Sequence, residues 1–322
     1  MRARFVLAAC AATVYGTLAM AQGSGGKHLN PMIELHQQKK PLFGLYAPSN
    51  PRSTQGAPQV GTPKAVPELA KAAIEYDKSD FVFSGTMERS VDRGLASFTE
   101  FVNALMTAAP SADVRWRHPL SVKTEKIATD KAKAVENISK QLNLGVSTVV
   151  FVGVESADEV KTGLAAMRFK AKGGTRPDAV GSAPAYWGLD EKAYREKADV
   201  WPLNPNGELT NWTIVESKEG LAHVREIAAV KGIGVLWPGA GTLRGVFSST
   251  NAAGERVVDT AAWENAIQQV LSACKEFHVP CGFPANANDI ELRMKQGFSV
   301  FVMNWGDAGF KTVDVGRKAA GR

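Results

Sequence analysis

Short apolar runs alternate with amphipathic stretches from residue 42 to residue 304, and this alternation constrains the fold more than any other feature of the chain. Each run is four to seven residues long and largely apolar, as a parallel strand buried on both faces is. Parallel strands pair side by side only through long crossovers, which are usually helices. The eight runs are "LFGLYA" (42–47), "FVFSG" (81–85), "DVRW" (113–116), "TVVFVGV" (148–154), "WTIVE" (212–216), "IGVLW" (233–237), "CGFPA" (281–285) and "FSVFVMN" (298–304).

Helical periodicity fills most of the gaps between these runs. In "SFTEFVNALM" at 97–106 and "AAWENAIQQVLSACKEF" at 261–277, apolar residues recur three and four positions apart, which is typical of a helix that covers a sheet. Eight strands alternating with helices predict a (β/α)8 TIM barrel. A doubly wound open sheet is the alternative, but the chain has no G-x-G-x-x-G sequence after its first predicted strand, which favours the barrel.

The N-terminus has the pattern of a secretory signal peptide. Two arginines precede an apolar run that ends in the small-residue sequence Ala-Met-Ala at 19–21. We therefore expect cleavage before Gln22, so that residues 1–21 are removed and residues 22–322 form a single exported domain, periplasmic or secreted. A retained membrane anchor is the alternative, although the run is short and no later segment resembles a membrane span.

Charge is balanced and dispersed along the chain. The sequence has 38 Lys and Arg residues against 32 Asp and Glu residues, and loss of the two signal-peptide arginines leaves a net charge of +4. Lysines and acidic residues are interleaved, as in "KTEKIATDKAKAVENISK" at 123–140, which is typical of a solvated helix face. The sequence contains no basic patch of the kind that binds nucleic acid, so a nucleic-acid partner is not expected.

Two features leave alternatives open. Cys274 and Cys281 remain after signal cleavage in an oxidising compartment, where they form either a disulfide or a pair of buried thiols. Their spacing does not suggest a metal site, and the chain has no C-x-x-C or H-E-x-x-H sequence. An insertion near 178–211 carries several Trp and Tyr residues and precedes a strand, so we expect an oligomer contact or a barrel plug rather than a ligand platform.

In a parallel barrel, reactive groups lie where strands end and βα loops begin, because these loops gather around one mouth. Polar and turn-forming residues stand at these points of the predicted strands. The candidates are Tyr46, Glu88, Arg115, Glu155, Glu216, the turn at 238–242, Asn286 and Asn304.

Four sequence blocks carry a resemblance to a known family. "GVESADEV" at 153–160 runs from a predicted strand into a helix, and "RFKAKGGTRP" at 168–177 ends that helix. "TIVE" at 213–216 and "IAAVKGI" at 227–233 belong to the fifth predicted strand and the next helix. Together these blocks resemble the HpcH/HpaI aldolase/citrate lyase family, whose likeness spans most of the chain after the signal peptide and implies a barrel of the phosphoenolpyruvate/pyruvate type.

The resemblance implies an activity and roles for three residues. Members of that family cleave or form a carbon–carbon bond next to a 2-oxo acid or a thioester, with Mg²⁺ or Mn²⁺ stabilising the enolate. By the resemblance, Glu216 is the metal ligand and Arg115 is the arginine on the enolate oxygen. Glu88 stands where the family has a catalytic histidine and is a candidate for proton transfer. The resemblance also implies a homo-oligomer.

The turn after the sixth predicted strand departs from the family. Thr242 replaces the aspartate that is the family's second metal ligand. Gly239, Ala240, Gly241 and Thr242 are candidates for a substrate-binding turn, because glycines let backbone N–H groups approach a ligand. The resemblance implies a carbon–carbon lyase that acts on a 2-oxo or hydroxy acid through a metal-stabilised enolate, together with a small-molecule oxo-acid substrate. The alternative is a barrel that has lost its metal pair and binds a small acid without catalysis.

Overall fold

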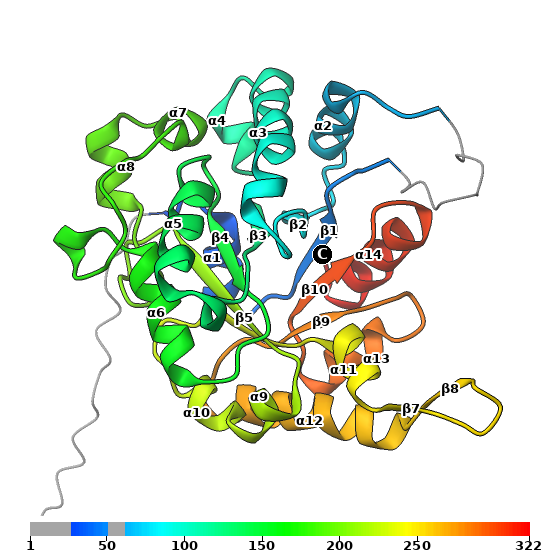
Figure 1. Ribbon diagram of the computed structural model, residues 1–322. Coiled ribbons are helices and arrows are strands. Elements are labelled where there is room, and N and C mark those ends of the chain that lie inside the picture. The colour runs from blue at the N-terminus through cyan, green and yellow to red at the C-terminus, as the bar shows by residue number, and fades with distance from the viewer. Residues whose placement is uncertain (1–26, 51–61) are drawn as a thin grey trace, which may run out of the picture.

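Eight parallel strands close into a barrel in the computed structural model, which describes residues 27–50 and 62–322 (Figure 1). The hydrogen-bonded order is β6-β5-β4-β3-β2-β1-β10-β9, and a parallel bridge between Leu236 and Cys281 joins the two ends. The predicted (β/α)8 barrel is confirmed. The strands are β1 (Leu42–Tyr46), β2 (Val82–Ser84), β3 (Leu120–Lys123), β4 (Thr148–Phe151), β5 (Thr210–Val215), β6 (Val235–Pro238), β9 (Gly282–Pro284) and β10 (Val300–Met303).

Helices surround the strands and begin where the sequence offers caps. The side chains of Ser90, Ser156 and Asp259 each accept a backbone N–H in the first turn of the helix that follows. The α-helices are α1 (Pro31–Gln37), α2 (Val66–Glu75), α3 (Val91–Ala108), α4 (Ala112–Arg115), α5 (Lys131–Leu142), α6 (Ala157–Met167), α7 (Ala183–Trp187), α8 (Glu191–Lys197), α9 (Lys218–Ala222), α10 (Val224–Ala228), α11 (Ala240–Val246), α12 (Thr260–Glu276), α13 (Ile290–Gln296) and α14 (Asp307–Ala319), with short 3-10 turns η1 (Ile127–Thr129) and η2 (Lys170–Lys172).

The third predicted strand is wrong. "DVRW" lies in α4, and the strand in this place is β3, whose sequence is "LSVK". A continuous apolar run does not identify β3, because Ser121 and Lys123 alternate with its apolar residues. The Ser121 side chain is nevertheless fully buried. Its ladder partners are β2 and β4, with Val122 beside Ser84 on one side and Val149 on the other. The other seven predicted runs overlap observed strands.

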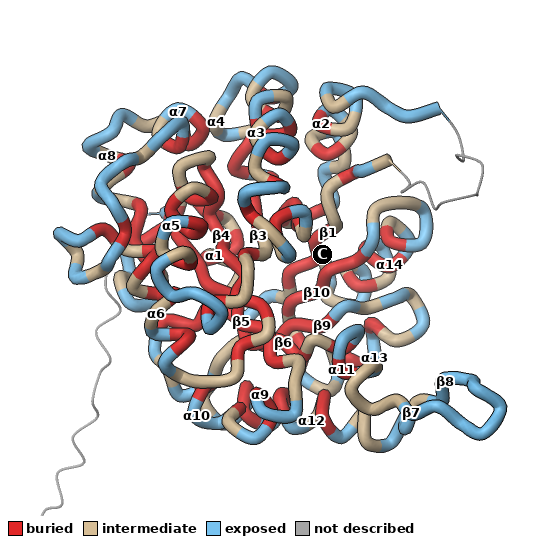
Figure 2. Tube along the Cα trace, viewed as in Figure 1, coloured by how far each residue is buried: buried red, intermediate tan, exposed pale blue. Residues whose placement is uncertain are grey.

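The barrel interior is packed with aromatic and aliphatic side chains. Trp212 of β5 stacks on Trp237 of β6 with ring centroids 5.8 Å apart, and Phe83 of β2 also stacks on Trp212, at 6.0 Å. Met32 of α1 joins the same cluster, so α1 closes the N-terminal end of the barrel. Figure 2 shows the strands as the buried centre of the molecule, with exposed residues on the outer helices. The interior is thus a packed core, and in folds of this kind the reactive groups lie at the carboxyl ends of the strands.

The insertion near 178–211 packs on the barrel through its aromatic residues. Tyr186, Trp187 and Tyr194 are all buried, and Trp187 Nε1 donates to the Gly145 carbonyl oxygen at 2.9 Å. Gly145 has φ +93°, and a Cβ there would lie 2.6 Å from the Tyr186 ring, so both its backbone conformation and this contact require glycine. The rings therefore belong to the core rather than to an open ligand platform.

An antiparallel hairpin that the sequence analysis did not predict follows α11. Its strands are β7 (Ser248–Thr250) and β8 (Arg256–Val258), and it projects from the body of the barrel in Figure 1. Val257 on this hairpin is one of the few large hydrophobic residues that are exposed. No helix in the described part of the chain is long and apolar enough to cross a membrane. The predicted signal peptide, residues 1–21, lies outside the described residues.

Cys274 and Cys281 form a disulfide, which decides between the two alternatives that the sequence left open. The bond joins α12 to the segment that enters β9, and both cysteines are buried. Reduction is expected to lower the free energy of unfolding by about 2 kcal/mol, because the bond restricts a short loop in the unfolded chain. Urea denaturation with and without dithiothreitol measures this change. A Cys274→Ser/Cys281→Ser variant that still loses stability on adding the reductant would contradict this assignment.

Candidate active site

A cavity of about 370 Å³ opens at the carboxyl ends of the strands, and we call it the mouth cavity. Its charged and polar rim is formed by side chains that follow five different strands. The rim residues that matter for the chemistry are Tyr46 of β1, Lys123 of β3, Glu216 after β5, Thr242 after β6 and Asn304 after β10.

The floor of the mouth cavity is apolar. Trp212, Ile214, Trp237 and Val302 line it from below. The indole Nε1 of Trp212 is buried without a hydrogen-bond partner among the described residues. Charged groups at the rim therefore lie against a surface of low polarity, where Coulomb interactions are stronger than in water.

Glu216 occupies a place that two glycines make for it. A Cβ on Gly239 would lie 2.6 Å from Glu216 Oε2, so the first glycine of the "PGAG" turn is required by the glutamate side chain. Gly153, at φ +58°, would place a Cβ 3.7 Å from Glu216 Oε1. The carboxylate is thus held between the turns that follow β4 and β6, at the rim where the sequence predicted it.

Lys123, which lines the cavity after β3, forms an ion pair with Glu88. Lys123 Nζ donates to Glu88 Oε1 at 3.0 Å, and only 14% of the lysine side chain is exposed. Tyr46 lies beside this pair, since a Cβ on Gly85 would come within 4 Å of all three side chains. Burial raises the pKa of Tyr46, an effect that the Lys123 charge opposes and the Glu88 and Glu216 carboxylates reinforce. The tyrosine is therefore a neutral O–H donor at neutral pH.

A second lysine approaches Glu216. Lys126 Nζ donates to Glu155 Oε2 at 2.6 Å, and this hydrogen bond lowers the pKa of the Glu155 carboxyl group. The Lys126 stem passes next to Glu216, because the position of a Cβ on Gly153 is 3.5 Å from Lys126 Cδ and 3.7 Å from Glu216 Oε1. One ammonium group, that of Lys123, therefore lines the cavity where the resemblance implies a metal ion, and the Lys126 ammonium pairs with Glu155 beside it.

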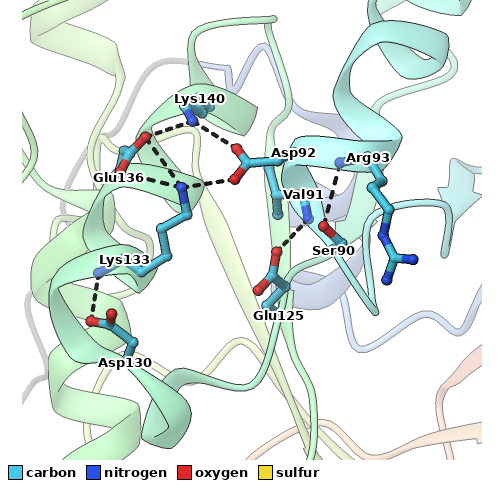
Figure 3. A network of polar contacts seen from close by, with 9 residues as sticks. All are labelled: Ser90, Val91, Asp92, Arg93, Glu125, Asp130, Lys133, Glu136 and Lys140. Carbon is cyan, nitrogen blue, oxygen red and sulfur yellow. Dashed lines mark hydrogen bonds and ion pairs between the residues drawn. The ribbon is translucent and has the colours of Figure 1, made fainter.

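A network of polar contacts holds together the loops that carry these lysines and Glu88 (Figure 3). Glu125, between the two lysines in sequence, accepts the backbone N–H of Val91 at the start of α3 at 2.5 Å. Asp92 in turn binds Lys133 and Lys140 of α5, each at 2.9 Å. Ion pairs this exposed contribute little stability singly. These pairs join α3 to α5, and the Glu125 hydrogen bond joins the loop after β3 to the start of α3, so together they connect the segments that carry the rim residues.

The prediction that Arg115 lies at the barrel mouth is wrong. Arg115 ends α4, before β3 begins, so it lies at the opposite end of the barrel from Glu216. Its guanidinium is buried and donates to carbonyl oxygens, which leaves it no role on an enolate. The acceptors are Tyr186 (2.8 Å), Ala109 (2.6 Å), Pro110 (2.7 Å) and Ala185 (3.0 Å).

Lys123 is the cation that follows the third strand, and sequence reasoning missed it. The signal was present in "PLSVKT" at 119–124, where a basic residue ends a strand that begins after a proline. The error of about eight residues came from assigning the strand to "DVRW". Because a strand of this length crosses the barrel, this shift moved the predicted cation from one end to the other.

The turn at 239–242 does meet Glu216 at the mouth cavity. Gly239, Ala240, Gly241 and Thr242 all line it, and the last three form the first turn of α11. Trp263 Nε1 donates to the Ala240 carbonyl oxygen at 2.8 Å, which anchors the turn to α12. Thr242 is exposed and offers the cavity a neutral hydroxyl group.

These residues do not fit a resident divalent metal ion. Mg²⁺ and Mn²⁺ take about six oxygen ligands, with carboxylates supplying the charge. Among residues 27–50 and 62–322, no group of three His, Cys, Asp or Glu side chains is placed to hold a metal. Glu216 and the neutral Thr242 line the cavity after the neighbouring strands β5 and β6, and the other charged group of the lining is the Lys123 ammonium, which cannot be a metal ligand.

The comparisons with known proteins agree on family and fold. Residues 126–305 match the family model described as HpcH/HpaI aldolase/citrate lyase. An HpcH/HpaI aldolase/citrate lyase family protein from Burkholderia cenocepacia J2315 is 19% identical, with a TM-score of 0.63 over 90% of this chain and 97% of that one. An HpcH/HpaI aldolase from Desulfitobacterium hafniense DCB-2 is 14% identical, with a TM-score of 0.59 over 89% and 94%.

A third similar structure is that of macrophomate synthase, which is 16% identical, with a TM-score of 0.57 over 91% of this chain and 88% of that one. No curated protein matches the sequence. At these identities the likenesses show the barrel fold alone. The activities in the name of the matching family, aldolase and citrate lyase, are carbon–carbon lyase activities, and they support a function of that general type.

Proposed function

Because the chain belongs to the HpcH/HpaI aldolase/citrate lyase family, we propose that it cleaves or forms a carbon–carbon bond next to a 2-oxo or hydroxy acid. The acid binds in the mouth cavity. One observation carries the proposal: Lys123 after β3 and Glu216 after β5 line the same cavity, over an apolar floor. A cation and a carboxylate in one small cavity, here at the ends of two strands that flank β4, are what a reaction through an enolate needs.

Lys123 supplies the charge that an enolate requires. When the bond between C3 and C4 of a 4-hydroxy-2-oxo acid breaks, its electron pair moves into the 2-oxo group and leaves a negative charge on that oxygen. The Lys123 ammonium stabilises this charge more strongly than water would, because the floor beneath it is apolar. Glu88 holds the ammonium in place through their 3.0 Å hydrogen bond.

Glu216 accepts the proton of the substrate hydroxyl group. Bond cleavage turns the C4 hydroxyl into an aldehyde, and its proton leaves as the enolate forms; the enolate is then protonated at C3, by the Glu216 carboxyl group or water, to give pyruvate. The Glu216 carboxylate lines the cavity and has no ion-pair partner within 4.0 Å among the described residues, so it is free to take the proton. Tyr46, a neutral O–H donor at the same rim, contributes a hydrogen bond to the bound acid.

Family members generally depend on a divalent metal, and the sequence analysis expected Mg²⁺ or Mn²⁺ here too. The side chains at the rim do not provide the ligands that such an ion needs. In the proposed mechanism, Lys123 therefore stabilises the negative charge of the enolate. Turnover is therefore expected to persist in a chelating buffer. If activity is lost in the chelator and restored only by added Mg²⁺ or Mn²⁺, a metal ion rather than Lys123 stabilises the enolate.

Replacement of Glu216 by glutamine is expected to lower kcat by about 10²-fold or more, because an amide cannot accept the hydroxyl proton. The measurement is pyruvate release from a panel of 4-hydroxy-2-oxo acids, with chelator and with added divalent ions. Glu219→Gln is the matched control, since Glu219 is three residues away and its side chain is 65% exposed. Absence of turnover with every acid and every ion would reject the lyase function.

The second candidate is a barrel that binds a small acid without turning it over. Thr242 in place of a second carboxylate favours it, because a neutral hydroxyl can hold a ligand but supplies no charge or proton acceptor to the reaction. Binding of a 2-oxo acid measured by calorimetry, with no pyruvate release, would select this alternative.

We also propose that the protein is exported and that it is a homo-oligomer. The N-terminal sequence pattern supports export, and a disulfide between Cys274 and Cys281 is typical of an oxidising compartment. N-terminal sequencing of the secreted protein and its mass in solution test these two proposals.

A further inference from the structure

A second cavity of about 440 Å³ adjoins the mouth cavity, and we call it the side chamber. It lies between the ends of β1 and β2 and the helices α2 and α3. Tyr46 and Phe83 line both cavities, and their rings meet edge to face with centroids 4.9 Å apart. The two cavities are therefore neighbours that share a wall.

The walls of the side chamber are mainly apolar. Phe98 and Phe101 of α3 and Leu69 and Val66 of α2 line it beside the shared Phe83. Phe83, Phe98 and Phe101 are each less than 10% exposed, so their positions are set by the core behind them. A chamber of this kind stabilises a ligand by removing apolar surface from water.

Four of the polar side chains that line the side chamber, those of Asn50, Ser84, Thr86 and Ser97, already have hydrogen-bond partners. Asn50 exchanges two hydrogen bonds of 2.8 Å with the backbone of Lys64. The hydroxyl groups of Ser84 and Thr86 bond to each other, and Ser97 Oγ donates to the Gly94 carbonyl oxygen at 3.0 Å. A charged or strongly polar ligand group would therefore break existing bonds without replacing them, whereas an apolar group fits the walls as they are.

We propose that the side chamber binds an apolar tail of the substrate, so that the enzyme prefers 2-oxo acids with an aryl or other bulky apolar group. This inference rests on the proposed function, because the mouth cavity must bind the acid end. Glu88 lines the side chamber and pairs with Lys123 of the mouth cavity. The apolar tail of the substrate would therefore meet its 2-oxo acid group next to this ion pair. The charged groups of the mouth cavity bind the 2-oxo acid group, and the side chamber distinguishes acids by their apolar substituent.

The test compares pyruvate with phenylpyruvate by calorimetry on the full protein. Phenylpyruvate is expected to bind roughly tenfold or more tightly than pyruvate, as burial of an apolar group in a matching pocket gives. In Leu69→Lys, which introduces a charge into the chamber wall, the ratio of the two affinities is expected to fall to about one. Leu292→Lys is the matched control, since Leu292 is 55% exposed on α13 and its substitution should leave both affinities unchanged.

A second variant tests the chamber without a new charge, because the lysine in Leu69→Lys could also destabilise the fold. Ser97→Phe adds bulk from an exposed position of α3 that lines the chamber, and the same fall in the ratio is expected. Equal affinity of the wild-type protein for the two acids, or an unchanged ratio in both variants, overturns the side-chamber proposal while the proposed function stands. A wild-type protein that binds neither acid overturns both.

Discussion

Replacing Lys123 by methionine is expected to lower kcat for cleavage of a 4-hydroxy-2-oxo acid by about 10²- to 10³-fold, as loss of one oxyanion-stabilising donor does. Methionine keeps the length and apolar stem of lysine but removes the charge beside the enolate oxygen. The loss falls mainly on kcat, because the negative charge on that oxygen is larger in the transition state than in the bound substrate. Steady-state pyruvate release measures it.

Two variants separate the charge of Lys123 from its packing. Lys123→Arg keeps a cation at the rim and is expected to retain more activity than Lys123→Met, although its planar group fits the Glu88 contact differently. Lys311→Met, at an exposed position of α14, is the matched control for loss of a lysine. Unchanged kcat in Lys123→Met would remove the central charge from the proposed mechanism.

The barrel could be predicted because its strands are buried on both faces. Seven of the predicted runs overlap observed strands, and each is apolar enough to stand out from the helical segments beside it. β3 could not be found in this way, because Ser121 and Lys123 alternate with apolar residues in a strand of only four residues. Ser121 is buried by its neighbours in the sheet, and a single-sequence pattern cannot show such neighbours.

Site residues could be predicted where they directly follow a strand that the sequence identifies correctly. Glu216 and Gly239 follow strands whose ends were assigned correctly, and the structure brings them into contact. Arg115 shows the opposite case. Because its strand was assigned incorrectly, its predicted position lies at the opposite end of the barrel from its observed position. Lys123 stands out once β3 is placed at 120–123, because its side chain then ends a strand over an apolar floor, in the cavity that Glu216 also lines. The side chamber likewise depends on α2 and α3 packing beside two strand ends.

Arg115→Met is expected to lower the free energy of unfolding by about 3 kcal/mol, because four backbone carbonyls lose a charged donor and those inside the core are left without a partner. Two of these carbonyls belong to α7, so the variant also loosens the insertion from the end of α3. The rate of substrate cleavage at a temperature where the variant is folded should stay close to that of the wild type, since Arg115 lies at the far end of the barrel. Urea denaturation and steady-state kinetics measure the two effects, with the exposed Arg117→Met as the matched control. A large fall in kcat with unchanged stability would contradict the structural role and place Arg115 in the active site, as its sequence position had suggested.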